Sequence, residues 1–298
     1  MASREKTPAP QSGDGKLLDY ARLMRLDKPV GIYLLLWPTL WALWFAADGT
    51  PPLHLLLIFV AGTVLMRSAG CVINDFADRN FDGHVERTKH RPIAAGRVSP
   101  REALVLFAVL ALLALAVAAP LNALALGLSV PAAALAASYP FAKRFHSLPQ
   151  AHLGIAFSWG IPMAFAAVTG SVDWTMAGLL MAANLAWVIA YDTLYAMVDR
   201  EDDLKIGVKS SAILFGSADR LIVGLLHGVS LLLLALAGLR AGLNGAYFAG
   251  LALAGLAAVH QQWQVRHRDR AACFSAFLQN NRFGALVFIG LLVAHLTS

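Results

Sequence analysis

Long apolar runs recur along the whole chain, separated by short polar or turn-forming segments. A membrane-spanning helix needs about 20 apolar residues, and the runs have about this length. We therefore expect spans at residues 30–47, 53–74, 101–119, 121–139, 151–170, 174–198, 217–238, 243–263 and 282–297. Turn residues such as Pro120 and Asn122 separate neighbouring runs. The pattern predicts an all-α, polytopic membrane protein with nine transmembrane helices.

The distribution of charge gives these spans a direction. Of the 24 Lys and Arg residues, 22 lie in the N-terminal segment or in loops on the same side, Arg240 lies on the other side, and Arg67 lies within a span. Cytoplasmic loops carry an excess of Lys and Arg, so the N-terminus is expected in the cytoplasm. The net charge of +6 then marks a membrane face and not a nucleic-acid groove.

Composition agrees with a membrane protein, since 58% of the residues are hydrophobic and only 14% are charged, whereas soluble domains have about 25% charged residues. Residues 1–16 are polar and contain no apolar signal core, so we expect a disordered cytosolic tail followed by one transmembrane domain, 17–298. Cys71 and Cys273 form neither a disulfide framework nor a metal-type pair, and are interpreted as packing residues.

Two acidic stretches follow apolar runs at their cytoplasmic ends. "CVINDFADRNFD" (71–82) follows the second span and "YDTLYAMVDREDD" (191–203) follows the sixth. On a helix, residues three or four apart share a face. One face would carry Asn74, Asp78 and Asp82, and the other would carry Asp192, Asp199 and Asp203.

Carboxylates that converge at a low-dielectric boundary resist ionisation unless a cation neutralises them. Mg²⁺ prefers oxygen ligands and is commonly held by one or two carboxylates together with substrate phosphates. The two stretches therefore predict a Mg²⁺-diphosphate site. Nearby basic residues are candidates for the remaining phosphate oxygens: Arg79, Arg87, Lys89, Arg91, Lys143, Arg144 and Lys205. Solvated interfacial charge is the alternative, but two matched clusters on one side favour the metal site.

Other polar residues lie near the same membrane face. Arg67, two turns deeper than Asn74, is either a counter-ion for an acid such as Asp192 or a receptor for a substrate carboxylate; a charge inside a span is costly and needs some such partner. Tyr139 and Lys143 are four residues apart and are either site residues or interfacial anchors. The basic segment 89–99 is a candidate lid over the diphosphate.

Longer motifs show a family resemblance. "AGCVINDFADRNFDGHVERTKHRPIAAGRVS", "YPFAKRFHSLPQAHLG", "IPMAFAAV", "YDTLYAMVDREDD" and "IGVKSSAILFG" resemble the UbiA family of membrane prenyltransferases, and within it the branch that prenylates hydroxybenzoate. The resemblance runs almost from end to end. It implies nine helices around a central cavity that opens to the cytoplasm.

The resemblance also implies an activity: Mg²⁺-dependent transfer of a polyprenyl group from polyprenyl diphosphate to the carbon ortho to the hydroxyl of 4-hydroxybenzoate, for ubiquinone biosynthesis in the bacterial inner membrane. It places Mg²⁺-diphosphate on Asn74, Asp78, Asp82, Asp199 and Asp203. It places diphosphate near Tyr139 and Lys143, with Arg144 beside them, and favours the carboxylate role for Arg67. Asp192 is a candidate for the proton-accepting base or for a hydrogen bond to the phenol.

Two alternatives remain at this point. One is a family enzyme with another aromatic acceptor. The other is an ion-coupled transporter, although transporters keep coupling carboxylates near the midplane of the bilayer, whereas these acids lie at helix ends.

Overall fold

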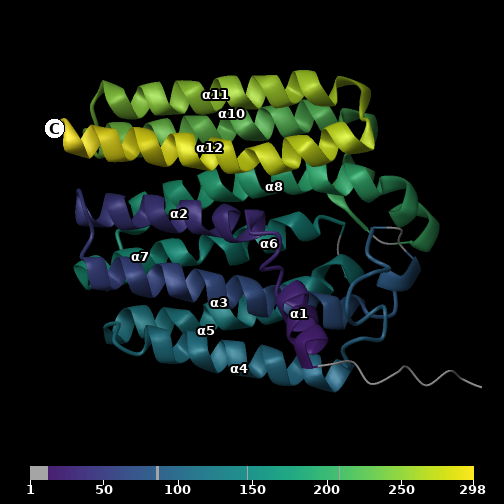
Figure 1. The fold of residues 1–298 in the computed structure, drawn as a ribbon. Coiled ribbons are helices and arrows are strands. Elements are labelled where there is room, and N and C mark those ends of the chain that lie inside the picture. The colour runs from purple at the N-terminus through teal and green to yellow at the C-terminus, as the bar shows by residue number, and fades with distance from the viewer. Residues whose placement is uncertain (1–12, 85–86, 146, 208) are drawn as a thin grey trace, which may run out of the picture.

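The computed structural model describes residues 13–84, 87–145, 147–207 and 209–298, and every regular element in these ranges is a helix (Figure 1). The α-helices are α1 (Gly13–Leu23), α2 (Val30–Ala47), α3 (Leu53–Asp78), α4 (Pro100–Ala118), α5 (Ala123–Ser138), α6 (Pro149–Ser158), α7 (Gly160–Thr169), α8 (Trp174–Ile206), α9 (Ser211–Phe215), α10 (Asp219–Arg240), α11 (Gly245–Gln264) and α12 (Arg270–Leu296). Short 3₁₀ turns occupy Asp82–His84, Tyr139–Arg144, Gly216–Ala218 and Val265–His267.

The expected class, an all-helical polytopic membrane protein, is confirmed. Within the described residues, eight segments are long and apolar enough to cross a bilayer, with the pair α6 and α7 forming one of them. The span expected at 243–263 is the helix α11, which falls outside this set because polar side chains such as His260, Gln261 and Gln262 follow one another near its end.

Several boundaries differ from those expected, and α3 and α8 run beyond 74 and 198 to Asp78 and Ile206. Helix α12 begins at Arg270, so Arg282 lies within the helix and not in the preceding loop. Helix α1 begins at Gly13, so residues 13–16 of the expected disordered tail are helical, while residues 1–12 lie outside the described part of the chain. Local polar residues explain other starts: Asp173 caps α8 by accepting hydrogen bonds from the N–H groups of Thr175 and Met176.

Most long helices run side by side, with α10, α11 and α12 on one flank and α4 and α5 on the other (Figure 1). The interior between α2, α8 and α12 is filled by aromatic rings, among them Trp41, Trp187 and Phe283. Asn280 is fully buried there, and its Oδ1 accepts from Trp187 Nε1 at 2.9 Å. Such a satisfied polar contact fixes how α8 and α12 are rotated against each other.

Close packing of α11 on α12 depends on glycine. A Cβ added to Gly250 would lie 2.6 Å from Gly290 Cα, so the two backbones touch where neither residue has a side chain. Small residues allow this approach between membrane helices.

Helices α3 and α8 carry the acidic stretches, and both are longer than a bilayer core requires. They have 26 and 33 residues, or roughly 39 and 50 Å at 1.5 Å per residue, against a hydrocarbon thickness of about 30 Å. Their final turns lie at the same end of the molecule, where α1 crosses α3 (Figure 1). The fold therefore brings the two stretches to one face.

Candidate active site

The first acidic stretch forms the last turns of α3 and the 3₁₀ turn beyond it. Asn74 Nδ2 donates to Asp78 Oδ2 at 3.3 Å, as expected for residues one turn apart. Asp82 accepts from Arg91 Nη1, with oxygen distances of 3.2 and 3.0 Å. Burial raises the pKa of Asp82, Arg91 acts against this shift, and the charges of Asp78 and Asp75 add to it. These acids favour a positive neighbour, as the sequence predicted.

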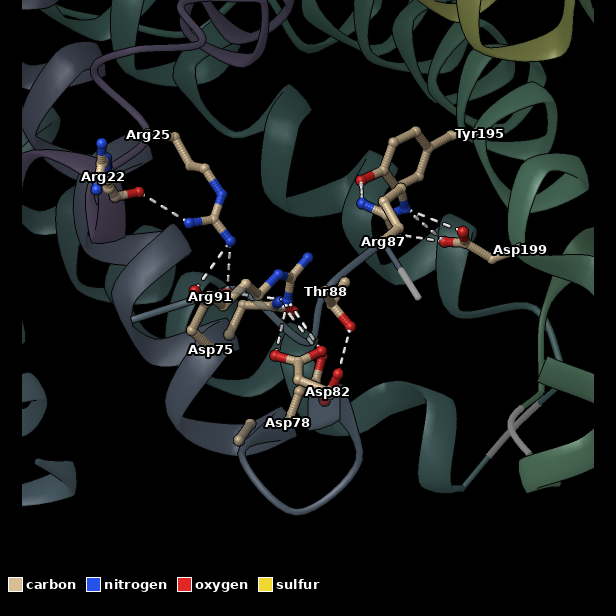
Figure 2. A network of polar contacts seen from close by, with 12 residues as sticks. Arg22, Arg25, Asp75, Asp78, Asp82, Arg87, Thr88, Arg91, Tyr195 and Asp199 are labelled. Atoms are coloured by element: carbon tan, nitrogen blue, oxygen red, sulfur yellow. Dashed lines mark hydrogen bonds and ion pairs between the residues drawn. The ribbon is translucent and has the colours of Figure 1, made fainter. Parts of the chain in front are cut away.

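Asp75 lies in the same stretch but has different partners. Arg25 Nη2 donates to both of its carboxylate oxygens at 2.9 Å. Arg91 Nη1 lies 3.0 Å from Asp75 Oδ1, and the Asp75 residue is 1% exposed. One buried carboxylate therefore binds two guanidinium groups from separate segments of the chain (Figure 2).

The second acidic stretch is contacted by the loop that follows the first. We define the basic loop as residues 87–99. Its first residue, Arg87, donates through Nε to Asp199 Oδ1 at 2.9 Å and Oδ2 at 3.1 Å, and through Nη2 to Oδ2. Arg87 Nη1 donates to the Tyr195 hydroxyl, and its guanidinium lies over the Tyr195 ring at 4.4 Å (Figure 2). The basic loop therefore connects both motifs.

Asp203 and Asp192, the other two acids predicted to share a face with Asp199, occupy different surroundings. Asp203 lies one turn beyond Asp199 and borders a surface hollow together with Ser147 and Lys209. Asp192 lies two turns before Asp199, within hydrogen-bonding reach of Gln150. Gln150 is itself fixed, because its Oε1 accepts from the Ser211 N–H at 3.1 Å.

Arg67 lines an apolar cavity of about 450 Å³ between α3, α4, α5, α6 and α7. Its Nε is buried and has no hydrogen-bond partner in the described part of the chain. No direct ion pair joins Arg67 to Asp192 or to any other described acid. The two side chains are close enough for their charges to interact, so both roles of Arg67 stay predictions. The guanidinium lies 5.9 Å from the Phe157 ring centroid. A buried donor that faces a cavity is suited to an anionic ligand.

Gly31 of α2 makes room for this guanidinium. A Cβ at position 31 would lie 2.5 Å from both Arg67 Nε and Nη2. Any larger residue would push the guanidinium aside. The placement of Arg67 thus depends on a glycine that sequence reasoning did not select.

Tyr139 lines the same cavity as Arg67, at the end of α5. The side chain of Lys143 lies outside the described residues, so its predicted role stays a prediction. Arg144 donates to the Ala77 carbonyl at the end of α3 and lies 5.2 Å from the Phe141 ring centroid. It therefore connects the 3₁₀ turn after α5 with the first acidic stretch.

The basic residues predicted to bind phosphate oxygens differ in what they contact. Arg87 and Arg91 bind the acids of the two motifs. Arg79 turns back to the Phe76 carbonyl and ring, and Lys205 lies 3.6 Å from Asp202. Of these four residues, only Arg87 and Arg91 contact Asp82 or Asp199. We call the predicted ligands Asp78, Asp82, Asp199 and Asp203 the acidic centre.

Among the described residues, no three His, Cys, Asp or Glu side chains form a ready-made metal cage. Mg²⁺ does not require one, because it commonly retains water and substrate phosphate ligands and uses few protein carboxylates. The oxygen donors of Asn74, Asp78 and Asp82 fit this type of coordination. The assignment of Asn74, Asp78, Asp82, Asp199 and Asp203 as metal ligands remains a prediction.

Sequence reasoning missed Tyr195, Arg25 and Asp75 as parts of the site. Tyr195 had a readable signal, since it lies four residues before Asp199 on the same helix. Asp75 belonged to the quoted motif but lies off the face of Asn74, Asp78 and Asp82. Arg25 had no local signal, because its partner is 50 residues away.

Comparison with known proteins gives consistent matches. Residues 35–290 match the model of the UbiA prenyltransferase family. The chain is 60% identical over 277 residues to a 4-hydroxybenzoate octaprenyltransferase of Azoarcus sp. (strain BH72), covering 93% of this chain and 96% of that protein. It is 54% identical to a protein of the same name from Chromohalobacter salexigens, over 98% of this chain and 97% of that protein.

Two solved structures are similar in fold. The apo structure of a UbiA homolog from Aeropyrum pernix K1 has a TM-score of 0.78 and 28% identity, covering 88% of this chain and 97% of that one. A UbiA homolog from Archaeoglobus fulgidus bound to GPP and Mg²⁺ has a TM-score of 0.69 and 18% identity, covering 92% and 99%.

Proposed function

The chain belongs to the UbiA prenyltransferase family, and on that basis we propose that it is a 4-hydroxybenzoate octaprenyltransferase of ubiquinone biosynthesis. The enzyme transfers an octaprenyl group to 4-hydroxybenzoate. The observation that carries this function is the 60% identity to a relative of that name over nearly the full length of both proteins.

The reaction is an electrophilic aromatic substitution. The allylic C–O bond of octaprenyl diphosphate breaks, diphosphate leaves, and the resulting allylic cation is attacked by the ring carbon ortho to the hydroxyl. The ring proton then passes to a base. Preorganised positive groups lower the barrier by stabilising the departing oxyanion, so Arg87 and Arg91, which already lie among the acids, are suited to binding its oxygens.

Mg²⁺ would be held by Asn74, Asp78, Asp82, Asp199 and Asp203, and when bound it supplies charge stabilisation to the leaving diphosphate. Asp82 and Asp199 are paired with Arg91 and Arg87 in the structure, so Mg²⁺ binding at these acids would require the two guanidinium groups to move to the diphosphate oxygens. A Mg²⁺-bound family member of the same fold supports the assignment.

The acceptor would lie with its carboxylate on Arg67. The unpartnered buried Nε and the adjoining cavity support this orientation, because a guanidinium binds a carboxylate through two parallel hydrogen bonds. Tyr139 lines the same cavity and would adjoin the diphosphate end of the donor, with Lys143 and Arg144 beyond it. Asp192, two turns before Asp199, would accept a hydrogen bond from the phenol or receive the ring proton.

The isoprenoid tail requires an apolar path. The cavity is lined almost wholly by apolar side chains, and several of these, such as Leu112 and Val130, are also exposed on the outer surface of the bundle. A long tail would follow the cavity and continue into the bilayer. We propose that the enzyme is a multi-pass protein of the bacterial inner membrane with its acidic centre on the cytoplasmic side.

The test is a product assay with purified protein in detergent. The protein would be incubated with Mg²⁺, prenyl diphosphates of several lengths and a panel of aromatic acceptors, including 4-hydroxybenzoate, homogentisate and phenol. We expect one product, an octaprenylated 4-hydroxybenzoate, identified by mass and fragmentation. A preference for another acceptor would overturn the substrate assignment. Solute uptake by proteoliposomes without any prenyl transfer would instead indicate a transporter.

A further inference from the structure

We propose that Asp75 is a positioning residue and not a metal ligand: it connects the N-terminal segment to the basic loop and thereby sets the diphosphate-binding surface. The inference rests on the proposed function for its kinetic consequence. Its structural part, an ion-paired clamp of Arg25, Asp75 and Arg91, stands on geometry alone (Figure 2).

Asp75 lies on a different face of α3 from Asn74 and Asp78. Asn74, Asp78 and Asp82 are spaced by four residues, and consecutive helical residues point about 100° apart. Asp75 therefore leaves α3 on another face and reaches Arg25, which belongs to the connection between α1 and α2. Its position in the motif makes it look like a fourth ligand, but it leaves α3 on another face than Asn74 and Asp78 and meets Asp82 through Arg91, which contacts both carboxylates.

Both carboxylate oxygens of Asp75 already have guanidinium partners. Both oxygens of Asp75 accept from Arg25 Nη2 at 2.9 Å, and Oδ1 also lies 3.0 Å from Arg91 Nη1. A metal ion would have to displace a guanidinium from a side chain that is 1% exposed. Two guanidinium partners neutralise this carboxylate fully, so its burial is already compensated without Mg²⁺.

On the N-terminal side of the clamp, Arg25 is held in an uncommon backbone conformation. Arg25 has a positive φ of 59°, which is uncommon for a residue with a side chain and needs local support. That support includes a hydrogen bond from Arg25 Nη1 to the Arg22 carbonyl at 2.9 Å. The bifurcated contact from Nη2 to both oxygens of Asp75 fixes the other amino group of the guanidinium.

The same N-terminal segment also holds the far end of the basic loop. Leu23 of α1 is fully buried in one apolar cluster with Ile93 and Val98 of the loop. Arg97 Nε donates to Asp19 Oδ1 at 2.8 Å, and Lys16 Nζ donates to the Arg97 carbonyl at 3.0 Å. Helix α1 and Arg25 precede the residues that match the family model, 35–290.

The clamp is connected to the proposed diphosphate site through Arg91 and Arg87. Arg91 divides its Nη1 between Asp75 and Asp82, and Arg87, four residues earlier, binds Asp199. Without the Asp75 carboxylate, Arg25 loses its anchor and Arg91 is held by Asp82 alone. The loop would loosen and its two arginines would no longer be preorganised for diphosphate. The acceptor at Arg67, deeper in the membrane, would be little affected.

Three variants test the clamp. Asp75→Asn keeps the shape and removes the charge, while Arg25→Gln leaves every carboxylate in place. Asp27→Asn is the matched control, because Asp27 is exposed on the same segment and is not part of the clamp. The first readout is trypsin cleavage within the basic loop in the metal-free, substrate-free protein in detergent. We expect cleavage about tenfold faster in Asp75→Asn and Arg25→Gln than in wild type and Asp27→Asn.

The second readout is kinetic. Loss of a charge-assisted hydrogen bond corresponds to roughly tenfold or more in binding, so both variants should raise KM for prenyl diphosphate about tenfold. KM for 4-hydroxybenzoate and the Mg²⁺ concentration for half-maximal rate should stay within about twofold. The double variant should be no worse than Asp75→Asn alone, since Asp75→Asn already removes the contact with Arg25.

Three outcomes would overturn the clamp. If Asp75→Asn raises the Mg²⁺ requirement tenfold, or abolishes Mn²⁺ binding measured by paramagnetic resonance, Asp75 is a metal ligand. If Arg25→Gln changes neither proteolysis nor KM for prenyl diphosphate, the N-terminal segment does not position the loop. If Asp75→Asn does not fold but Arg25→Gln behaves as wild type, Asp75 serves only stability. Should the enzyme use another substrate, the proteolysis result still decides the structural part.

Discussion

Arg87 binds Asp199 from a loop 112 residues earlier in the chain, with its Nε 2.9 Å from Asp199 Oδ1. This contact joins the segment after the first acidic motif to the second motif. Arg91 of the same loop binds Asp82 of the first motif. The two motifs are therefore connected by positive side chains as well as by the bundle, and several predictions depend on this arrangement.

The acidic centre should be essential for turnover and not for folding. Asp78→Ala and Asp199→Ala should each reduce kcat by 100-fold or more, because each removes a carboxylate proposed to hold Mg²⁺, and electrostatic stabilisation of this kind is worth about 10²–10³ in rate. Chelation should have the same effect and be reversed by added Mg²⁺. Insertion and yield of purified protein serve as the control, and near-normal rates in either variant would reduce the acids to interfacial charges.

Arg67 should determine acceptor affinity. Arg67→Lys keeps the charge but loses the planar pair of donors, so KM for 4-hydroxybenzoate should rise about 10- to 100-fold. KM for prenyl diphosphate should change little, because Arg67 lies two helical turns, roughly 10 Å, from Asn74. Phenol, which lacks the carboxylate, should be a poor acceptor for both proteins. Loss of diphosphate binding in the variant would assign Arg67 to the donor instead.

Gly31 should act through Arg67. In Gly31→Ala the new Cβ would overlap the guanidinium at 2.5 Å, and the guanidinium must move because it is the far end of a flexible side chain. We expect a higher KM for 4-hydroxybenzoate with nearly unchanged thermal stability. Combining Gly31→Ala with Arg67→Lys should add little to the Arg67→Lys effect. Full additivity of the two changes would show that Gly31 acts independently of Arg67.

Asp219 should stabilise the end of α8. It is fully buried and accepts from Arg268 Nε and Nη2 and from Arg200 Nη1, so it connects the loop before α12 to the residue after Asp199. Asp219→Ala should lower the midpoint of thermal unfolding in detergent by a few degrees; the effect is moderated because both arginines are partly exposed to solvent. Arg240→Ala, which breaks an exposed pair with Asp173, is the matched control and should change the midpoint little.

Membrane orientation can be tested by cysteine labelling. In a variant without Cys71 and Cys273, a cysteine at Lys205 should react with an impermeant reagent only in opened cells. A cysteine at Gly49, in the turn between α2 and α3, should react in intact cells. The charge distribution requires this result. Labelling at 205 in intact cells would contradict the proposed topology.

Local patterns in the sequence suffice to predict the helical class, the positions of most spans and the two acidic stretches at helix ends. Each of these follows from local periodicity, because bilayer thickness sets the length of an apolar run and the helical repeat sets which residues share a face. The sequence also identified Arg67, since a charge within an apolar run is visible without a structure. Boundaries were less certain: α12 begins at Arg270, because the polar residues 279–282 interrupt its apolar run without ending the helix.

The contacts of those residues depend on how distant parts of the chain fold together. Arg25 and Asp75 are 50 residues apart and Arg87 and Asp199 are 112 apart, and no local pattern specifies such pairs. Asp75 belongs to the same motif as Asp78 and Asp82, and the N-terminal segment and the basic loop each give it one arginine partner. In the same way, Arg67 could be a counter-ion or a receptor on the sequence alone. The structure places its guanidinium against Gly31 and beside an apolar cavity, and the carboxylate role stays a prediction.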